Sequence, residues 1–380
     1  NHRSLNLLSF HAFLNVEAGA AGAFVSMVKY LKREGYEPKV FSLSINDEIK
    51  KMFDDLGVPY SCPKSFSTIE KLVFLRKISK EIPKEYDIAF FSHYAYSPIL
   101  IKIMREIPRV YYLYEPPRIF YELHLKGVGL RRFDFITKEI DKMGTRAADL
   151  ILCSSDYIRE YIYKVYGKFA VVNRLGVDLE KYDYRKLGID VSYEKRDNVI
   201  VSVGVIHPQK AHDFIIRSLK YIPKPKRPKL LVITAGLIYD RLYLKEIYEL
   251  AKRLDIDIEI KEKFIPHKDF CLALARSKLM AIPYIMEPSV EPVAYAFKTP
   301  IVAVREAGAR EAVINKVTGL LVPRNVKEFA KAIEFLLDNP DIAAKMGERG
   351  YLFLKREYSM GKTIQELVKN ISILLGTLNR

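Results

Sequence analysis

The sequence is poor in cysteine and contains no tryptophan and no long apolar run. Its three cysteines, Cys62, Cys153 and Cys271, are widely spaced and form no CxxC pair, so neither a disulfide framework nor a zinc site is indicated. No apolar run approaches the ~18 residues that span a bilayer, and the opening segment lacks the pattern of a cleaved signal peptide. We therefore expect a protein of the reducing cytosol whose contact with any membrane is peripheral.

Positive charge is abundant. The 380 residues include 62 Lys and Arg against 46 Asp and Glu, a formal net charge of +16, which favours an anionic partner such as a phosphorylated ligand, nucleic acid or lipid headgroups. Hydrophobic residues make up 49% of the chain, as in compact proteins, and the length predicts two domains. Glutamine occurs only twice while Lys, Glu, Ile and Tyr abound, a bias associated with thermophiles.

Short apolar runs alternate with longer amphipathic stretches in both halves, which is typical of parallel sheets with crossover helices. The segments 5–10, 38–43, 88–92, 109–113, 150–153, 170–173, 199–203, 230–235, 258–261, 279–282 and 301–304 are predicted strands. The charged, irregular stretch 179–198 is typical of a linker. We predict an α/β protein with two Rossmann-like, doubly wound domains facing across a cleft, at residues 1–180 and 181–360. Residues 361–380 are expected to form a helix that packs back on the first domain.

The segment SVGVIHPQKAHDF suggests an anion site. A predicted strand ends at Gly204, a loop carries Lys210, and a helix is predicted to begin near His212. This layout can place an ammonium group and free helix amides around a phosphate. The alternative is a plain strand-turn-helix with a solvated lysine.

A second segment, PYIMEPSVEPVAYAF, gathers carboxylates at a strand-to-helix turn. Glu287 follows an apolar strand, and Ser289 can cap a helix whose first turn includes Pro292. Glu287 and Glu291 can accept hydrogen bonds from the hydroxyls of a polyol. The alternative is that Glu291 stabilises the helix dipole and Glu287 is merely exposed.

In their order and spacing, these and other segments resemble glycosyltransferase family 4. The matching pieces are Gly19 and Gly22, RAADLILCSSDYIREYI, LGVDLEKYD, the stretch from Gly204 to Lys210, FIPHKDFCLALARSKL, EPSVEPVAYAFKTPIVA and REAGAREAVINKVTGLLVP. Together they span nearly the whole chain. Family members are retaining enzymes of the two-domain GT-B fold that use nucleotide-diphosphate sugars, and the likeness extends to lipopolysaccharide and lipid-linked mannosyltransferases.

The resemblance implies roles for individual residues. Lys210 would neutralise the donor diphosphate, Glu287 would contact the transferred sugar, and Gly19 would let the backbone approach the donor phosphates. Phe264 and Ile265 would lie near the nucleobase. The full donor-binding set that we predict is Gly19, Gly22, Gly204, Lys210, Phe264, Ile265, Glu287, Ser289, Val290 and Glu291. The donor is a substrate, and no cofactor and no metal are expected.

The chain departs from the family pattern around the phosphate loop. Val205 stands where the family commonly has Arg, so one of two expected diphosphate cations is absent, and Lys210 acts alone or with another group. Ala211 stands where the family usually has Gly.

The family's pair of acidic residues is also altered. Eight residues after Glu287, at the position of the second carboxylate, the chain has Tyr295, whereas counting back from Thr299–Pro300 puts Val293 at that position. We predict that Glu291, the nearest carboxylate, replaces it, and Tyr295 itself is the alternative.

The first half offers polar candidates after two predicted strands. The stretch RVYYLYEPPRIFYELH resembles one in which the family usually has a His, and Tyr114 holds that position. With an ordinary pKa near ~10, Tyr114 is a poor general base at neutral pH but can hydrogen-bond a sugar. Glu115, or His93 after the preceding strand, can supply polar function, and the alternative for His93 is a satisfied strand-end histidine. The predicted catalytic set is Glu287, Lys210, His93, Tyr114 and Glu115.

Two basic stretches with interleaved apolar residues, 64–84 and 118–135, suggest contact with an anionic membrane surface that carries a lipid-linked acceptor. The alternative is that each helix simply packs on its own sheet.

We therefore predict a retaining glycosyltransferase that moves a hexose-like sugar from a nucleotide-diphosphate sugar to an acceptor hydroxyl on a lipid-linked or surface glycan. One alternative is a catalytically weakened relative that binds sugar nucleotide or glycan without efficient transfer. A nucleic-acid-binding protein is suggested only by the net charge, and because no reader motif is present, no nucleic-acid partner is expected.

Overall fold

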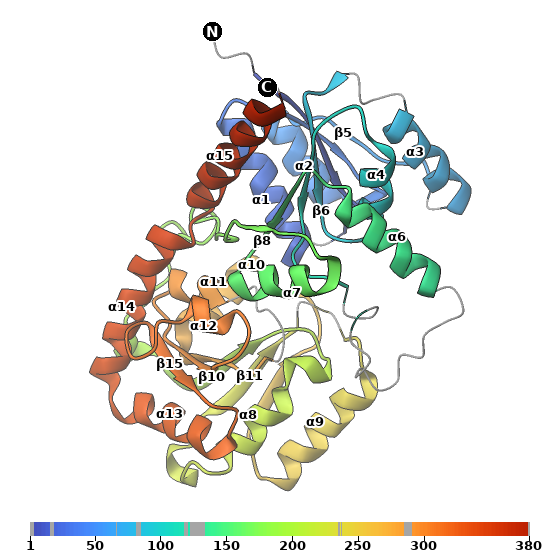
Figure 1. Cartoon of the computed structure of the whole chain (residues 1–380). Helices are drawn as coiled ribbons and strands as arrows, with labels where there is room; N and C mark the ends of the chain where they lie inside the picture. The colour runs from blue at the N-terminus through green and yellow to red at the C-terminus, as the bar shows by residue number, and fades with distance from the viewer. Residues whose placement is uncertain are drawn as a thin grey trace. The chain divides into compact units, whose positions relative to one another are not determined.

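The computed structural model describes residues 4–15, 19–65, 67–80, 85–117, 121, 134–234, 236, 238–284 and 291–378. The chain divides into two compact units. The first combines Asn1–Leu175 with Met360–Arg380, and the second is Gly176–Ser359. Each unit is built on its own parallel sheet with helices packed against it (Figure 1). The predicted α/β class with two doubly wound sheets is confirmed.

The sheet of the first unit has the strand order β5-β3-β1-β6-β7-β8-β9, and all of its pairings are parallel. Its strands are β1 (Asn6–His11), β3 (Glu37–Phe41), β5 (Tyr60–Ser61), β6 (Ile88–Ser92), β7 (Arg109–Tyr112), β8 (Leu150–Cys153) and β9 (Val171–Val172). A separate short pair joins β2 (Phe13–Leu14) to β4 (Ser44–Ile45). The strand order reverses at β1, between β3 and β6, which is where open α/β sheets bind ligands.

Two apolar cores flank this sheet because successive strand residues point to opposite faces. One core contains Phe10 and Phe91. The other contains Phe90 together with Phe24 of helix α1 and Ile364 of helix α15. These two helices lie side by side (Figure 1). The helices of this unit are α1 (Gly19–Arg33), α2 (Asp47–Leu56), α3 (Thr68–Lys80), α4 (Ser97–Ile103), α6 (Asp134–Arg146), α7 (Asp156–Tyr166) and α15 (Met360–Leu378).

Local sequence signals set helix ends in this unit. The Asn46 side chain accepts a hydrogen bond from the backbone N–H of Ile49 at 2.8 Å and so caps α2, which ends at Gly57 with a left-handed φ of 62°. Ser155 caps α7 in the same way, and that helix ends at Gly167 with φ 65°. A polar cap followed by a terminal glycine is the expected frame of a short helix.

The sheet of the second unit has the order β12-β11-β10-β13-β14-β15, again parallel. Its strands are β10 (Asp197–Val203), β11 (Lys229–Ile233), β12 (Ile258–Lys261), β13 (Ser277–Ile282), β14 (Ile301–Val304) and β15 (Gly319–Val322). Its helices are α8 (His212–Leu219), α9 (Arg241–Arg253), α10 (His267–Arg276), α11 (Glu291–Ala296), α12 (Ala309–Ala312), α13 (Val326–Asp338) and α14 (Pro340–Glu357), with a 3-10 turn, η3, at Pro208–Lys210. Here the order reverses at β10, between β11 and β13.

The sequence located most strands correctly. The predicted strands 88–92, 150–153, 258–261 and 301–304 are confirmed at both ends, whereas the short strands β2, β4 and β5 and the strand β15 were missed. None of the described helices has the length and apolar character needed to cross a bilayer.

Candidate active site

Lys210 lies at the carboxyl edge of the second unit's sheet, beside the strand where the order reverses. It ends the η3 turn, and α8 begins two residues later. The Lys210 stem lies against Gly204, because a Cβ added at Gly204 would be 3.1 Å from Lys210 Cδ and 3.2 Å from its Cγ. The predicted strand, loop and helix are confirmed, and Gly204 has a packing reason that only the three-dimensional structure supplies.

Tyr284, just beyond β13, supports the Lys210 ammonium group. The Nζ atom lies 4.1 Å from the centroid of the Tyr284 ring, a cation–π distance. The Tyr284 hydroxyl donates a hydrogen bond to the carbonyl of Val203, at the end of β10. Tyr284 therefore ties the ends of β10 and β13 together and holds the lysine at the edge of the sheet. Sequence reasoning missed it, although a tyrosine directly after a buried strand was the available signal.

A second cation lies at the same edge but is already paired. Arg324 follows β15, and its Nε and Nη2 atoms lie 2.9 and 2.7 Å from Oε2 of Glu306, which follows β14. Arg324 Nη2 also donates to the carbonyl of Tyr284 at 3.1 Å. Arg324 is thus paired with Glu306 and braces Tyr284 at this edge of the sheet.

His212 is the first residue of α8, and its side chain holds the start of this helix in place. It is fully buried, with Nδ1 3.3 Å from Ser202 Oγ and Nε2 3.3 Å from the carbonyl of Val205. Burial lowers the pKa of His212 to about 4. The neutral imidazole anchors the loop before α8. Ala211, the residue that precedes His212, has a left-handed φ of 49°. This conformation explains why a glycine is usual at that position in the family.

The carboxylate segment is only partly described. Glu287, Ser289 and Val290 lie outside the described residues. Glu291 begins α11, and Pro292 is in its first turn as predicted. Their proposed roles stay predictions.

Tyr295 cannot stand in for the second carboxylate of the family. It is 1% exposed, and its hydroxyl lies 2.8 Å from Thr318 Oγ1 and donates to the Ala312 carbonyl at 3.2 Å. The family spacing therefore places a core residue here and not a ligand, which corrects the candidate that the sequence left open.

The predicted nucleobase residues lie on the loop between β12 and α10. The Phe264 side chain is 57% exposed, and Ile265 is half-buried. Gly236, with φ 75°, lies next to this loop, because a Cβ on it would be 3.0 Å from the Phe264 nitrogen. The loops that follow β11 and β12 are thus in backbone contact at the carboxyl edge of the sheet.

In the first unit, Gly19 begins α1 with φ 54° and an exposed position, and Gly22 lies in the first turn of that helix.

His93 follows β6 with a left-handed φ of 70°, and burial lowers its pKa to about 4. The Tyr114 hydroxyl is 3.1 Å from Ser92 Oγ, and burial raises the Tyr114 pKa, which strengthens the argument against a general base. Glu115 follows as a half-buried residue.

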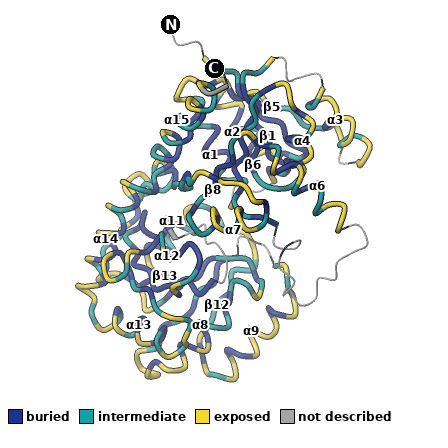
Figure 2. The backbone as a smooth tube through the Cα atoms, viewed as in Figure 1, coloured by how far each residue is buried: buried dark blue, intermediate teal, exposed yellow. Residues whose placement is uncertain are grey.

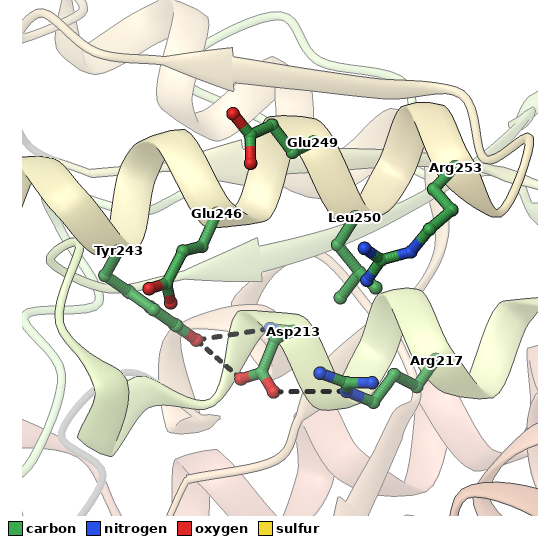
Figure 3. Close-up of a pocket in the computed structure, with 7 residues that line it drawn as sticks. All are labelled: Asp213, Arg217, Tyr243, Glu246, Glu249, Leu250 and Arg253. Carbon is green, nitrogen blue, oxygen red and sulfur yellow. Dashed lines mark hydrogen bonds and ion pairs between the residues drawn. The ribbon is translucent and has the colours of Figure 1, made fainter.

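A separate cavity of about 220 Å³ lies between α8 and α9 (Figure 3). Its lining is formed by Asp213, Arg217, Tyr243, Glu246, Glu249, Leu250 and Arg253. The Tyr243 hydroxyl donates to Asp213 Oδ1 at 2.7 Å. None of the predicted site residues lines this cavity.

Among the residues that the structure describes, no group of three or more His, Cys, Asp and Glu side chains could hold a metal ion.

Comparison with known families identifies both halves of the chain. Residues 18–181 match the model of Glycosyltransferase Family 4, and residues 189–353 match that of glycosyl transferases group 1. The chain belongs to the family 4-like glycosyltransferases. The resemblance drawn from the sequence motifs is thereby confirmed, and so is the enzyme class, since the curated relatives are also named glycosyltransferases.

Two relatives show how far the likeness extends. A D-inositol 3-phosphate glycosyltransferase of Kribbella flavida is 30% identical over 53% of this glycosyltransferase, which spans about half, 51%, of that relative's length. An uncharacterised glycosyltransferase of Methanocaldococcus jannaschii is 26% identical over 77% of the chain and 78% of its own length.

Solved structures confirm the GT-B fold of this glycosyltransferase. HepE of Anabaena, in complex with UDP-glucose, superposes with a TM-score of 0.77 at 18% identity over 97% of this chain and 99% of its own. Sucrose-phosphate synthase of Thermosynechococcus elongatus gives 0.76 at 14% identity, covering 99% of this chain and all (100%) of its own.

Proposed function

We propose that this glycosyltransferase moves a hexose-like sugar from a nucleotide-diphosphate sugar to an acceptor hydroxyl with retention of configuration. The observation that carries the proposal is the Lys210 ammonium group, held by Tyr284 and Gly204 beside the start of α8. A neighbour of the same fold binds UDP-glucose, which supports a sugar nucleotide as the donor. We assign nucleotide-sugar binding mainly to the second unit and acceptor binding to the first, with Gly19 and Gly22 of the first unit proposed to approach the donor phosphates.

The chemistry that we propose depends mainly on stabilising the leaving group. The bond between the sugar's anomeric carbon and the diphosphate oxygen breaks, and the acceptor oxygen bonds to that carbon on the same face. The acceptor's proton passes to the departing diphosphate. Lys210 and nearby backbone amides stabilise the charge that develops on the diphosphate, while Glu287 and Glu291 accept hydrogen bonds from sugar hydroxyls.

Nucleotide binding tests this proposal. Lys210→Met keeps the apolar stem that packs on Gly204 but removes the charge, so we expect at least tenfold weaker binding of UDP or GDP and loss of donor hydrolysis. Lys252→Met, on the exposed end of α9, is the matched control and should behave as the unmodified protein. Equal nucleotide affinity in both variants would contradict the assignment of Lys210.

A binding protein without efficient transfer is the second candidate function. Val205, which removes one diphosphate cation, and the buried Tyr295 at the second acidic position favour it. The measurement that separates the two is turnover: release of free sugar or glycoside from a donor that binds supports the enzyme. Tight binding of the donor with no product over many hours supports the binder.

We also propose that α3 lies on an anionic membrane surface that carries the acceptor. One side of this helix packs on the sheet through the buried Phe74, Leu75 and Ile78, and its opposite side is exposed and could meet a membrane surface (Figure 2). On that side Ile69, Leu72 and Val73 are 75%, 62% and 61% exposed. They are followed by three exposed cations that pair with no described acid: Arg76, Lys77 and Lys80. The other basic stretch, 118–135, lies almost wholly outside the described residues.

A further inference from the structure

His11 ends β1 at the point where the first unit's strand order reverses. In the register of the parallel sheet, His11 lies opposite Ser92, and Ser92 lies opposite Tyr112. Tyr114 is two residues beyond Tyr112, so it returns to the same face as Ser92 and His11. Three polar side chains from three strand ends therefore meet on one face of the sheet, at its carboxyl edge.

A chain of hydrogen bonds links these side chains to helix α1. His11 Nδ1 lies 3.2 Å from Ser92 Oγ, and Ser92 Oγ lies 3.1 Å from the Tyr114 hydroxyl. Tyr114 in turn donates to the Ala20 carbonyl at 3.4 Å. Because a carbonyl only accepts hydrogen bonds, the Tyr114 proton is directed to Ala20. Ser92 then donates to Tyr114, and His11 Nδ1–H donates to Ser92.

Because Nδ1 of the neutral His11 ring carries the proton, Nε2 is unprotonated and has a lone pair that can accept a hydrogen bond. The residue is 4% exposed and lies between Phe24 and His93, with ring centroids 5.1 and 5.7 Å away. Within the described part of the chain, the Nε2 atom has no hydrogen-bond partner. Burial, helped by the nearby His93, lowers the pKa of His11 to about 3. The ring therefore stays neutral and is an acceptor of hydrogen bonds at any ordinary pH.

The His11 ring is buried, but its Nε2 atom is not among the fully shielded side-chain atoms that lack a hydrogen-bond partner, so a ligand can reach this acceptor. The hydroxyl of Tyr114 cannot serve a ligand in the same way, because its proton and its nearest acceptor position are already engaged with Ala20 and Ser92. The free acceptor, His11 Nε2 at the end of β1, therefore lies two strands away from Tyr114, which follows β7 and holds the position of the family's usual histidine.

We propose that His11 Nε2 binds the transferred sugar by accepting a hydrogen bond from one of its hydroxyls. This rests on the proposed function, and the donor sugar is favoured over the acceptor because the hydrogen-bond chain ends at Ala20, beside Gly19, where the donor diphosphate is expected. His11 takes the sugar-contacting role that the sequence suggested for Tyr114. No proton is transferred to the ring, because the leaving diphosphate receives the acceptor's proton.

Two substitutions of His11 separate binding from support. The amide of His11→Asn reaches only the Nδ1 position, so it keeps the hydrogen bond to Ser92 and loses the Nε2 acceptor. The longer His11→Gln places an amide oxygen near the Nε2 position. Ser9→Ala is the fold control, because the Ser9 hydroxyl is buried on the same strand without a hydrogen-bond partner.

The test compares UDP with UDP-glucose, and GDP with GDP-mannose, by calorimetric titration of the whole protein. For the pair in which the sugar adds affinity, we expect His11→Asn to bind the nucleoside diphosphate normally and the sugar nucleotide about tenfold more weakly. His11→Gln should recover part of the loss, and Ser9→Ala should lose nothing.

Unchanged affinity of His11→Asn for the sugar nucleotide would overturn the inference while leaving the proposed function intact. So would an equal loss for both ligands, or an unmodified protein whose affinity gains nothing from the sugar. Failure of the unmodified protein to bind any of the four ligands would instead overturn the proposed function.

Discussion

At the scale of single residues, Ala211 is the clearest place where the sequence and the backbone disagree. Its φ of 49° and ψ of 39° are left-handed, a conformation that costs a residue with a Cβ roughly 1–2 kcal/mol. We predict that Ala211→Gly raises the free energy of unfolding by about 0.5–1 kcal/mol, since the more flexible unfolded chain offsets part of the gain. Urea unfolding followed by circular dichroism measures it.

A helical alanine provides the control for that measurement. Ala344 lies within α14, where a change to glycine should destabilise by about 1 kcal/mol. If Ala211→Gly is destabilising to the same extent as Ala344→Gly, the left-handed conformation at position 211 is wrong.

The site shows what single residues reveal in sequence. Lys210 and Gly204 were predicted because they lie six residues apart in one local strand-turn-helix segment. Tyr284 and His11 were missed because their partners come from neighbouring strands that are distant in sequence. Tyr284 meets Lys210 and Val203 across the β10–β13 pair, and His11 meets Ser92 across β1–β6. Such partners follow only from strand order and register.

At the scale of elements, the strands that are buried along their whole length were the most predictable. Strands such as β6 and β14 are buried along their whole length, so they form continuous apolar runs. The missed strand β15 begins at Gly319, and a Cβ there would lie 2.2 Å from the Ile301 carbonyl oxygen. Its glycine is therefore required by strand packing, although glycine weakens the strand pattern in sequence.

Helix α3 carries the prediction about membranes. We predict that Leu72→Glu lowers affinity for phosphatidylglycerol vesicles at least tenfold, because it puts a negative charge among exposed apolar side chains beside an anionic surface. Reversing Arg76 and Lys80 to Glu should have a similar effect that fades as salt is raised, since each cation near such a surface contributes about 1 kcal/mol. Vesicle sedimentation measures both.

The matched control is Leu352→Glu, at an exposed leucine on α14 in the second unit. It should sediment with vesicles like the unmodified protein. Equal binding of Leu72→Glu and the unmodified protein, or equal binding to neutral phosphatidylcholine vesicles, would show that α3 is not the membrane contact.

The second unit as a whole depends on one buried arginine near its start. Arg196 is 5% exposed, and its guanidinium donates to the carbonyls of Phe297 at 2.7 Å and Ser277 at 2.8 Å and to Thr299 Oγ1 at 2.8 Å. These acceptors belong to the segments around β13 and β14, so Arg196 joins the entry of the unit to its central strands. Burial lowers the pKa of Arg196 to about 10, and because this value is still well above 7 the guanidinium stays charged at neutral pH.

We predict that Arg196→Lys destabilises the second unit by about 3 kcal/mol or more, because lysine cannot serve the forked set of buried acceptors. Limited proteolysis should then cut first within residues 176–359. Arg276→Lys, at an exposed position on α10, is the control and should leave the cleavage pattern unchanged. Cleavage that begins elsewhere in Arg196→Lys would contradict this role.

At the scale of the whole molecule, three of the described histidines, which folding keeps neutral, make stability depend on pH. Folding lowers the pKa of His11 to about 3 and those of His93 and His212 to about 4, whereas the unfolded chain titrates near ~6.5. Below that value the unfolded state binds protons that the folded state does not. Stability is therefore complete above about pH 6.5 and falls progressively toward pH 4, by about 2 kcal/mol per histidine at pH 5.

Urea unfolding at pH 8, 7 and 5 tests this pH dependence, with circular dichroism as the readout. From these groups we expect little change between pH 8 and 7 and a large loss between pH 7 and 5. The double variant His93→Gln and His212→Gln should lose about 4 kcal/mol less than the unmodified protein over the lower interval, whatever its stability at pH 8. The same loss in both proteins would mean that these two imidazoles are protonated in the folded state at pH 5, which would contradict the neutral anchoring role of His212.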